Sequence, residues 1–472
     1  MQKNMIYNTY DKPPFGQMII FALQQLLAII AATIAVPTIV GNGMDPAAAL
    51  LGAGVGTIVY QLFTKFKSPV FLGSSFAFIG SMTAAFSGAA SASLGYLGII
   101  LGAIFAGHIY LIISIIIKKV GVKWINKLMP PAVIGPTVAL IGLSLAGAAI
   151  KDVFSYGPTD SNGAFIMSGK LWVSLICALV TLVVVILCST YGKKMAKLIP
   201  FIIGILAGYL VAMIFTIIGY CARVEDLKII DFAPFVNLLD NGRVTFETFL
   251  KLPDFSFISA FNGVSELSWS YVATIAVAYI PVAFVVFAEH IADHKNLSTV
   301  VGSDLITEPG LHRTLLGDGV GSMVGAFFGG CPNTTYGESV GCVAITRNAS
   351  IVTITTTAII SILISFVSPF VAFLDSIPGC VMGGVCITLY GFIAVSGLKM
   401  IQKVNLEDHA NLFTVSIILI VGIGGMAMRI GEVTITAIAC ALILGILVNI
   451  LLNAFKKKKE NEEENEEGNE NG

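Results

Sequence analysis

Charged residues are scarce in this sequence: Asp, Glu, Lys and Arg make up 12% of its 472 residues, while apolar residues make up 56%. A water-soluble chain of this length needs more charge to cover its surface, so a soluble globular protein is excluded. The mean hydropathy is +0.89. Apolar stretches of about 20 residues recur from Gln17 to Phe455, and each is long enough to cross about 30 Å of hydrocarbon. The sequence therefore predicts an all-α polytopic membrane protein.

Other absences narrow the function. The eight cysteines form no CxxC pair and lie mostly within apolar spans, which favours reduced, core-filling residues. No nucleotide-binding motif is present, which argues against primary ATP-driven transport, and no cofactor or nucleic-acid partner is expected. Residues Met1 to Phe15 are polar and are not followed by a short apolar core and cleavage site, so we expect no cleaved signal peptide.

Fourteen apolar segments can be counted along the chain. They lie near 17–40, 46–64, 69–87, 94–117, 128–150, 171–190, 198–220, 269–292, 311–329, 332–347, 350–370, 377–397, 410–428 and 432–455. An even number of spans places both termini on the same side of the membrane.

The basic residues orient these spans. With a cytoplasmic N-terminus, twenty of the 27 Lys and Arg residues fall inside and seven outside. Four of the seven lie in one long loop, near 221–268, where the positive-inside rule has little force. The asymmetry predicts fourteen spans with both ends in the cytoplasm. Beyond Phe455, four lysines suit the anionic inner leaflet, and the acidic run that follows them predicts a disordered tail over 456–472.

The fourteen spans divide into two sevens, and an odd number per half inverts the second half relative to the first. Such inverted repeats are common in transporters, with the substrate site near the midplane. The fifth and twelfth spans open with P-x-x-V-x-G, at Pro130 to Gly135 and at Pro378 to Gly383. The third and tenth spans each contain a proline, small polar residues and an aromatic residue, at Pro69 to Phe76 and Pro332 to Ser339. Broken backbone at membrane depth needs protein or water to satisfy it, so these two segments predict a binding site between the halves.

Span eight carries ionisable residues at its end: Glu289, His290, Asp293 and His294. Such residues inside a span cost several kcal/mol and normally face a cavity or a partner. Glu289 follows about twenty apolar or weakly polar residues and is the strongest functional candidate, whereas Asp293 and His294 also fit a capped helix end. A metal site formed by His290, Asp293 and His294 is an alternative, although no HExxH motif supports it.

Two further acidic residues lie in apolar surroundings. Glu338 follows Tyr336 and Gly337 in the tenth span, where glycine lets the backbone approach a ligand closely. Two carboxylates in one cavity suit a ligand with two N–H donors, and a buried carboxylate can exchange protons near neutral pH. Asp318 is either a helix cap or part of a coupling network. His108, alone in span four, is best explained as a core histidine.

At these residues the sequence resembles the nucleobase–ascorbate transporter family (nucleobase:cation symporter-2), and within it the bacterial uracil permeases. The resemblance covers nearly the whole chain. It is carried by Gly73-Ser74-Ser75-Phe76-Ala77-Phe78, Ala288-Glu289-His290, Pro309-Gly310-Leu311-His312-Arg313, and Glu338-Ser339-Val340-Gly341 with Thr346-Arg347.

The resemblance implies a substrate site and a mechanism. Glu289 and Glu338 would accept hydrogen bonds from the uracil ring nitrogens, and backbone N–H groups at Phe76 and near Gly337 would donate to its carbonyls. Tyr336 and Tyr390 would line the cavity, with Ser339 supporting the binding loop. Proton coupling would involve Glu289 and the set His290, Asp293, His294 and Asp318.

The family also implies a domain division, with short strands in spans three and ten. A core domain (17–120 and 269–370) would move against a gate domain (121–220 and 371–455) to alternate access, often as a homodimer. The remaining parts are a cytoplasmic N-terminus (1–16), an extracellular loop (221–268) and the tail (456–472).

Three positions depart from the family pattern: Gln25 replaces a histidine, Ser339 replaces an asparagine, and Asp293-His294 replaces a histidine one turn after Glu289. Glu338 favours uracil, because glutamine is more usual at this position in relatives that carry xanthine or urate. The leading prediction is proton-coupled uracil import across the cytoplasmic membrane. A purine permease, an anion transporter or channel of the same fold, and sodium coupling are the alternatives.

Overall fold

The computed structural model describes residues 5–121, 124, 129–193, 195–239, 242–430 and 433–470. Among the inner-side lysines counted above, Lys3, Lys123, Lys127 and Lys194 lie outside the described residues. Within the described ranges, nine helical segments are long and apolar enough to cross a membrane. They are α1 (Phe15–Val40), α2 (Pro46–Phe63), α4 (Ala92–Val120), α6 with α7 (Pro131–Ser144, Ala146–Val153), α8 (Gly169–Tyr191), α10 (Pro200–Ala222), α13 (Trp269–Val301), α18 (Gly379–Ile401) and the first part of α20 (Ala437–Glu470).

By their contacts with one another, the helices pack in two sets. The first helix group contains α1, α2, α4, α13, α14 (Leu311–Gly329) and α16 (Ile351–Ile364). The second helix group contains α6, α7, α8, α10, α18 and α19 (His409–Ile423). Glycine allows close packing in the first group: a Cβ on Gly52 of α2 would lie 2.6 Å from the Gly325 carbonyl oxygen of α14. Without a hydrophobic driving force between helices in lipid, such close backbone contact stabilises the pair through van der Waals packing.

Shorter elements complete the fold. The half-helices α3 (Ile79–Ser87) and α15 (Gly337–Thr346) belong to the two broken segments. The loop near 221–268 contains α11 (Ala233–Val236) and α12 (Ser256–Asn262), and α17 (Ser368–Asp375) follows α16. The remaining short helices are α9 (Met195–Leu198), η1 (Phe76–Phe78), η2 (Glu225–Leu227), η3 (Val264–Glu266) and η4 (Ile306–Gly310).

The two broken segments meet in a short antiparallel sheet. Strand β1 (Leu72–Ser74) pairs with β2 (Asn333–Thr335), and Gly73 lies opposite Thr334. The predicted short strands in spans three and ten are therefore confirmed. This pairing joins segments about 260 residues apart and satisfies backbone groups that would otherwise be costly inside a membrane.

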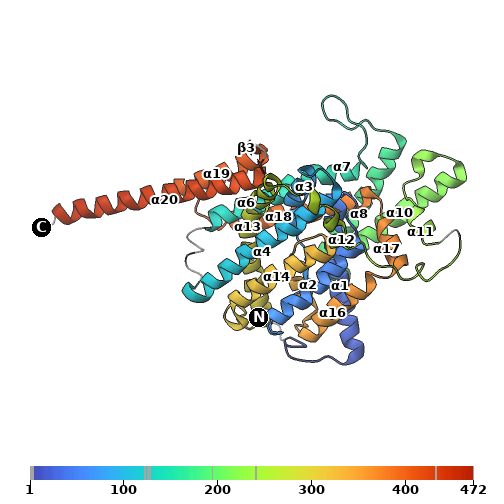
Figure 1. The fold of residues 1–472 in the computed structure, drawn as a ribbon, viewed down its shortest axis with the longest axis horizontal. Helices are drawn as coiled ribbons and strands as arrows, with labels where there is room; N and C mark the ends of the chain where they lie inside the picture. Colours follow the sequence, from blue (N-terminus) through green and yellow to red (C-terminus); the bar gives the residue numbers. More distant parts are fainter. Residues whose placement is uncertain are drawn as a thin grey trace.

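Two parts of the chain differ from the sequence-based expectations. Strands β3 (Met428–Ile430) and β4 (Val433–Ile435) form a second antiparallel pair between α19 and α20, where we expected the ends of two spans. All three residues of β4 are β-branched, which suits a strand better than a helix end. The tail expected to be disordered continues α20 as helix through Glu470, and Figure 1 shows this helix projecting away from the other elements. Lys and Glu are good helix formers, which explains the continuation.

Candidate functional site

A cavity of about 430 Å³ lies where the paired strands face the second helix group. One wall comes from the broken segments and α13, and the other from α6, α10 and α18. The lining residues are Ser75, Phe76, Ala77, Glu289, Ala292, Asp293, Thr334, Thr335, Tyr336, Gly337 and Glu338 on the first wall, and Val138, Ile141, Phe201, Leu389, Phe392, Ile393, Ser396 and Met400 on the second. We call this cavity the strand pocket.

Both helix starts that follow the strands open into the strand pocket. Ser75 to Ala77 lead from β1 into η1 and α3, and Tyr336 to Glu338 lead from β2 into α15. The first N–H groups of a helix have no intrahelical carbonyl partner, and the helix dipole makes this end electropositive. The pocket therefore offers backbone donors from two directions, which suits a ligand with two carbonyl groups.

Three carboxylates line the same pocket. Glu289 and Asp293 are one turn apart on α13 and so lie on one face of that helix, and Glu338 comes from α15. The Thr335 hydroxyl donates to one Asp293 oxygen at 3.0 Å. No Lys, Arg or His is among the described residues that line the cavity. Acceptors without a neighbouring cation suit a ligand that brings N–H donors or a positive charge.

Two buried hydroxyl groups in this wall have no protein partner. The Ser75 side chain is 0% exposed and the Thr334 side chain 6% exposed, and neither hydroxyl makes a hydrogen bond. Buried polar groups in folded proteins are nearly always paired with protein or water. These hydroxyls therefore have hydrogen-bonding capacity left for a polar ligand or an ordered water.

Tyr336 packs directly on the sheet. Its hydroxyl donates to the Ser74 carbonyl at 2.6 Å, and a Cβ on Gly73 would lie 2.4 Å from the Tyr336 ring. Glycine at position 73 is therefore required for the ring to lie against β1. Tyr390 of α18 does not line the pocket, but its ring packs edge-on against Phe76 with the centroids 6.1 Å apart.

Ser339 points away from the pocket toward the sheet and α1. Its hydroxyl oxygen accepts from the Gln25 side-chain amide at 2.5 Å and from the Phe71 backbone N–H at 3.0 Å. Gln25 and Ser339 are two of the residues that depart from the family pattern, and they contact each other. This pair ties α1, α15 and the residue just before β1 together, next to Glu338 in the chain.

Three of the predicted coupling residues form a separate buried network on another face of α13. The His290 ring lies 3.0 Å from an Asp318 oxygen through Nδ1 and 3.0 Å from the Thr314 hydroxyl through Nε2. His294 lies 2.8 Å from the Tyr60 hydroxyl, and the two histidine rings are 4.1 Å apart. All three predicted residues are at most 1% exposed.

This arrangement does not form the alternative metal site. Asp293 faces the strand pocket, whereas His290 and His294 face the buried network. Within the described parts of the chain, no group of three His, Cys, Asp or Glu side chains is placed to hold a metal ion. His108 is exposed on α4, with its Nδ1 atom 2.7 Å from the Ile104 carbonyl oxygen, so it is not the core histidine that we expected.

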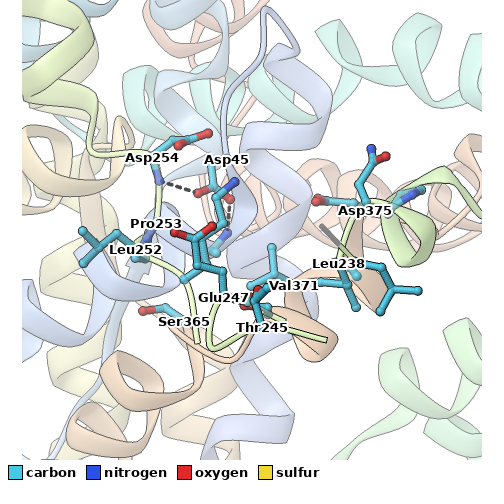
Figure 2. Close-up of a pocket in the computed structure, with 17 residues that line it drawn as sticks. Asp45, Leu238, Thr245, Glu247, Leu252, Pro253, Asp254, Ser365, Val371 and Asp375 are labelled. Carbon is cyan, nitrogen blue, oxygen red and sulfur yellow. Dashed lines mark hydrogen bonds between the residues drawn. The ribbon is translucent and has the colours of Figure 1, made fainter. Parts of the chain in front are cut away.

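A second acidic cavity, of about 520 Å³, lies beside the start of α2, the loop near 221–268 and α17 (Figure 2). We call it the loop cavity. Asp45 caps α2 by accepting from the Ala47 N–H at 2.7 Å, and its other oxygen accepts from the Asp254 N–H at 2.9 Å. Burial raises the pKa of the Asp45 carboxyl, although these two N–H groups partly oppose the rise. Burial, reinforced by the Asp45 charge, raises the pKa of Asp375 to about 6.

Comparison with known proteins places this geometry in a family. The sequence model of the permease family matches residues 16–431. The uracil permease of Bacillus caldolyticus is 39% identical over 93% of both chains. The uracil permease of Bacillus subtilis (strain 168) is 35% identical over 94% of both chains. That of Escherichia coli (strain K12) is also 35% identical, over 92% of this chain and 91% of the relative.

Solved structures with little sequence similarity share the fold. The transmembrane domain of the cyanobacterial bicarbonate transporter BicA superposes with a TM-score of 0.60 at 14% identity, covering 94% of this chain and all of that one. SLC26A9 gives a TM-score of 0.62 at 12% identity, covering 94% of this chain and 66% of that one.

A multi-pass helical fold whose pocket is lined by two broken segments and three carboxylates, together with the match to the permease family, defines a membrane transporter rather than an enzyme. The family model matches most of the chain, and the 35–39% identity extends over more than 90% of it, so family membership is established. The chain belongs to the xanthine/uracil permease family, that is, nucleobase:cation symporter-2.

Sequence reasoning found Phe76, Glu289, Asp293, Tyr336, Gly337 and Glu338 in the strand pocket. It missed the hydroxyls of Ser75 and Thr334 and the whole second wall, from Val138 to Met400. The hydroxyls were within quoted motifs and could have been named. The wall is apolar, as every span is, so nothing in its sequence distinguished it.

Proposed function

We propose that this protein imports uracil across the cytoplasmic membrane by symport with protons. The observation that carries the proposal is the strand pocket, which combines carboxylate acceptors with two helix N-termini. Three similar proteins are named uracil permeases. Uracil has two ring N–H donors and two carbonyl acceptors, so both kinds of protein group would find a partner.

In this proposal Glu289 and Glu338 accept hydrogen bonds from the ring nitrogens. Backbone N–H groups at Phe76 and Gly337 donate to the carbonyl oxygens. Tyr336 holds β1 against β2, and Tyr390 supports the Phe76 ring through their edge-on contact. Ser339 acts on the substrate indirectly, by fixing the position of α15.

The concentration of partly buried carboxylates in the strand pocket supports proton coupling. Glu289, Asp293 and Glu338 share one pocket without a basic side chain among the described lining residues, so holding all three ionised is costly. A proton taken up with the substrate lowers this cost and is released when the pocket opens to the cytoplasm. His290, His294 and Asp318 complete the proposed coupling set behind Glu289. Coupling to sodium is the alternative.

Alternating access requires one part of the protein to move against another. We propose that the first helix group belongs to a core domain and the second to a gate domain, in fourteen spans arranged as two inverted sevens. In this arrangement both termini are cytoplasmic and the protein is a homodimer. The strand pocket lies between these groups, so relative motion would expose it to each side in turn.

A purine permease is the second candidate, because purine bases such as xanthine also present N–H and carbonyl groups. Anion transport has less support. The fold is shared with a bicarbonate transporter, but a likeness at 14% identity concerns the fold alone. Three carboxylates around the pocket disfavour an anion.

The test is uptake of radiolabelled uracil into proteoliposomes, with an imposed inward proton gradient and with that gradient collapsed. We expect accumulation only with the gradient, competition by unlabelled uracil, and little competition by xanthine. Glu289→Gln should abolish accumulation in folded, inserted protein. Accumulation by this variant against a gradient would contradict the proposed site, and preferential competition by xanthine would favour the purine alternative.

A further inference from the structure

A third cavity, of about 360 Å³, lies between α13 of the first helix group and α6 and α18 of the second. Eight of its ten lining residues are apolar or alanine. The other two are Lys295, near the end of α13, and Lys403, just after α18. Both lysines are on the predicted cytoplasmic side. No carboxylate is among the described residues that line this cavity, which distinguishes it from the strand pocket and the loop cavity, both of which are acidic.

The two lysines are available to a ligand. Both are exposed, and neither takes part in any ion pair among the described residues. The walls beside them are formed by side chains such as Met129, Ile134 and Phe287. A free inorganic anion would satisfy the lysines and leave these apolar walls without a partner. The chemistry that satisfies both is an anionic head group attached to a hydrocarbon chain.

The membrane supplies such a molecule at this depth. Anionic lipids attract basic groups at the cytoplasmic surface, and basic pockets between membrane helices on that side bind lipid head groups. Lysine side chains near the end of a span place their ammonium groups at the head-group level while the apolar walls lie deeper. This geometry matches a phospholipid of the inner leaflet.

We propose that this cavity binds one anionic phospholipid of the inner leaflet, with its phosphate between Lys295 and Lys403 and an acyl chain along α6, α13 and α18. Ala292 and Met400 line both this cavity and the strand pocket. The lipid therefore touches both helix groups beside the substrate, and its presence regulates how readily they move past one another.

Lipid retention tests the site directly. Purified wild type, Lys295→Gln/Lys403→Gln and Lys399→Gln are titrated with phosphatidylglycerol, and bound lipids are counted by native mass spectrometry. Lys399 is exposed on α18 at the same end of the helix but does not line the cavity, so Lys399→Gln is the matched control. We expect the double variant to bind its tightest lipid roughly 30-fold more weakly, because each lysine contributes about fivefold. Unchanged binding by the double variant, or equal loss in the control, overturns the proposal.

Measurements of transport provide a second test of the lipid site. Uptake is measured in vesicles of phosphatidylcholine alone and of phosphatidylcholine with phosphatidylglycerol, and inorganic phosphate is added to the first kind as the free-anion control. We expect phosphatidylglycerol, but not phosphate, to raise the wild-type rate several-fold, and we expect the double variant to lose only this increase.

Three other transport results contradict the proposal. Stimulation of uptake by free phosphate would show that the lysines bind a soluble anion. A low uptake rate for the double variant in vesicles without anionic lipid would show that the lysines contribute to substrate transport itself. Equal stimulation of the double variant would show that the lipid acts elsewhere. This arm uses the proposed uptake as its readout, but lipid retention does not depend on it. Absence of uracil uptake by the wild type would therefore refute the proposed function and leave the lipid site to be judged by retention.

Discussion

The strand pocket and the loop cavity are both acidic, yet they differ in how their polar groups are satisfied. The loop cavity is larger, about 520 Å³ against about 430 Å³, but its Asp45 is already occupied by two backbone N–H groups. The strand pocket holds two buried hydroxyls without partners, beside two helix starts and three carboxylates. Buried hydroxyls without partners, rather than size or acidity, are therefore the difference on which the proposal of the strand pocket as the substrate site rests.

After the loss expected for Glu289→Gln, the largest effect is expected when the same substitution is made in each of the two cavities. Glu338→Gln should lower uracil uptake about 10- to 100-fold, because a charged acceptor for a ring N–H is replaced by a weaker, neutral one. Glu247→Gln in the loop cavity makes the same chemical change and should leave uptake within about twofold. Initial rates in proteoliposomes measure both. Equal losses of uptake in the two variants would show that the strand pocket and the loop cavity do not differ in their importance for transport.

The next largest effect is expected from the hydrogen-bonded pair of Gln25 and Ser339. Ser339→Ala leaves the Gln25 amide and the Phe71 N–H buried without their acceptor, and an unsatisfied buried group costs about 1–3 kcal/mol. We expect the KM for uracil to rise about tenfold, and the losses from Gln25→Leu and Ser339→Ala to be clearly less than additive.

Gln61→Leu is the control for the comparison of the Gln25→Leu and Ser339→Ala variants, alone and combined. Gln61 is also a buried glutamine paired with a hydroxyl, since it accepts from Thr355 at 2.7 Å, but it lies away from the pocket. The Gln61→Leu variant should have a lower thermal stability but no comparable rise in the KM for uracil. Additive losses at Gln25 and Ser339, or a similar KM rise in Gln61→Leu, would show that the pair does not position the site.

A change within the sheet should have an intermediate effect. Gly73→Ala places a methyl group against the Tyr336 ring, and overpacking of this kind costs about 1–3 kcal/mol. Displacing the ring should weaken uracil binding about five- to tenfold, while Gly163→Ala in an exposed turn should not change it. Binding isotherms of the purified variants give the comparison, and unaltered affinity in Gly73→Ala would contradict the packing role of Tyr336.

The smallest effect concerns the loop cavity and pH. The docked loop raises the pKa of Asp45 above its usual value and that of Asp375 to about 6, so the docked state binds more protons than the free loop between about pH 4 and 6. Docking should therefore strengthen as pH falls through this window and weaken as pH rises. Other charged groups facing this region are Asp254, Glu247 and Lys251.

Hydrogen exchange of residues 245–254, corrected for its intrinsic pH dependence, measures loop docking. We expect slower exchange at pH 4.5 than at pH 7 in the wild type and a smaller difference in Asp375→Asn. A pH-independent exchange rate in the wild type, or an unchanged difference in the variant, would contradict the assignment.

The sequence revealed those parts of the protein whose residues are unusual for a membrane span. Prolines, small polar residues and Glu338 stand out within an apolar span, so two broken segments and a binding site could be predicted from residues 69–76 and 332–339, whereas the short strands followed from the family resemblance. The wall formed by α6, α10 and α18 could not, because apolar residues in a membrane helix serve lipid, packing and ligand contact alike. The contact between Gln25 and Ser339 spans more than 300 residues, and each residue alone looked like an isolated departure.

The direct test of the central claim is equilibrium binding of labelled uracil to purified wild type, Glu289→Gln and Glu247→Gln, all verified as folded. If the strand pocket is the substrate site, wild type and Glu247→Gln bind uracil with the same affinity and Glu289→Gln does not bind measurably. Full affinity in Glu289→Gln, or loss of binding in Glu247→Gln, would move the substrate site out of the strand pocket.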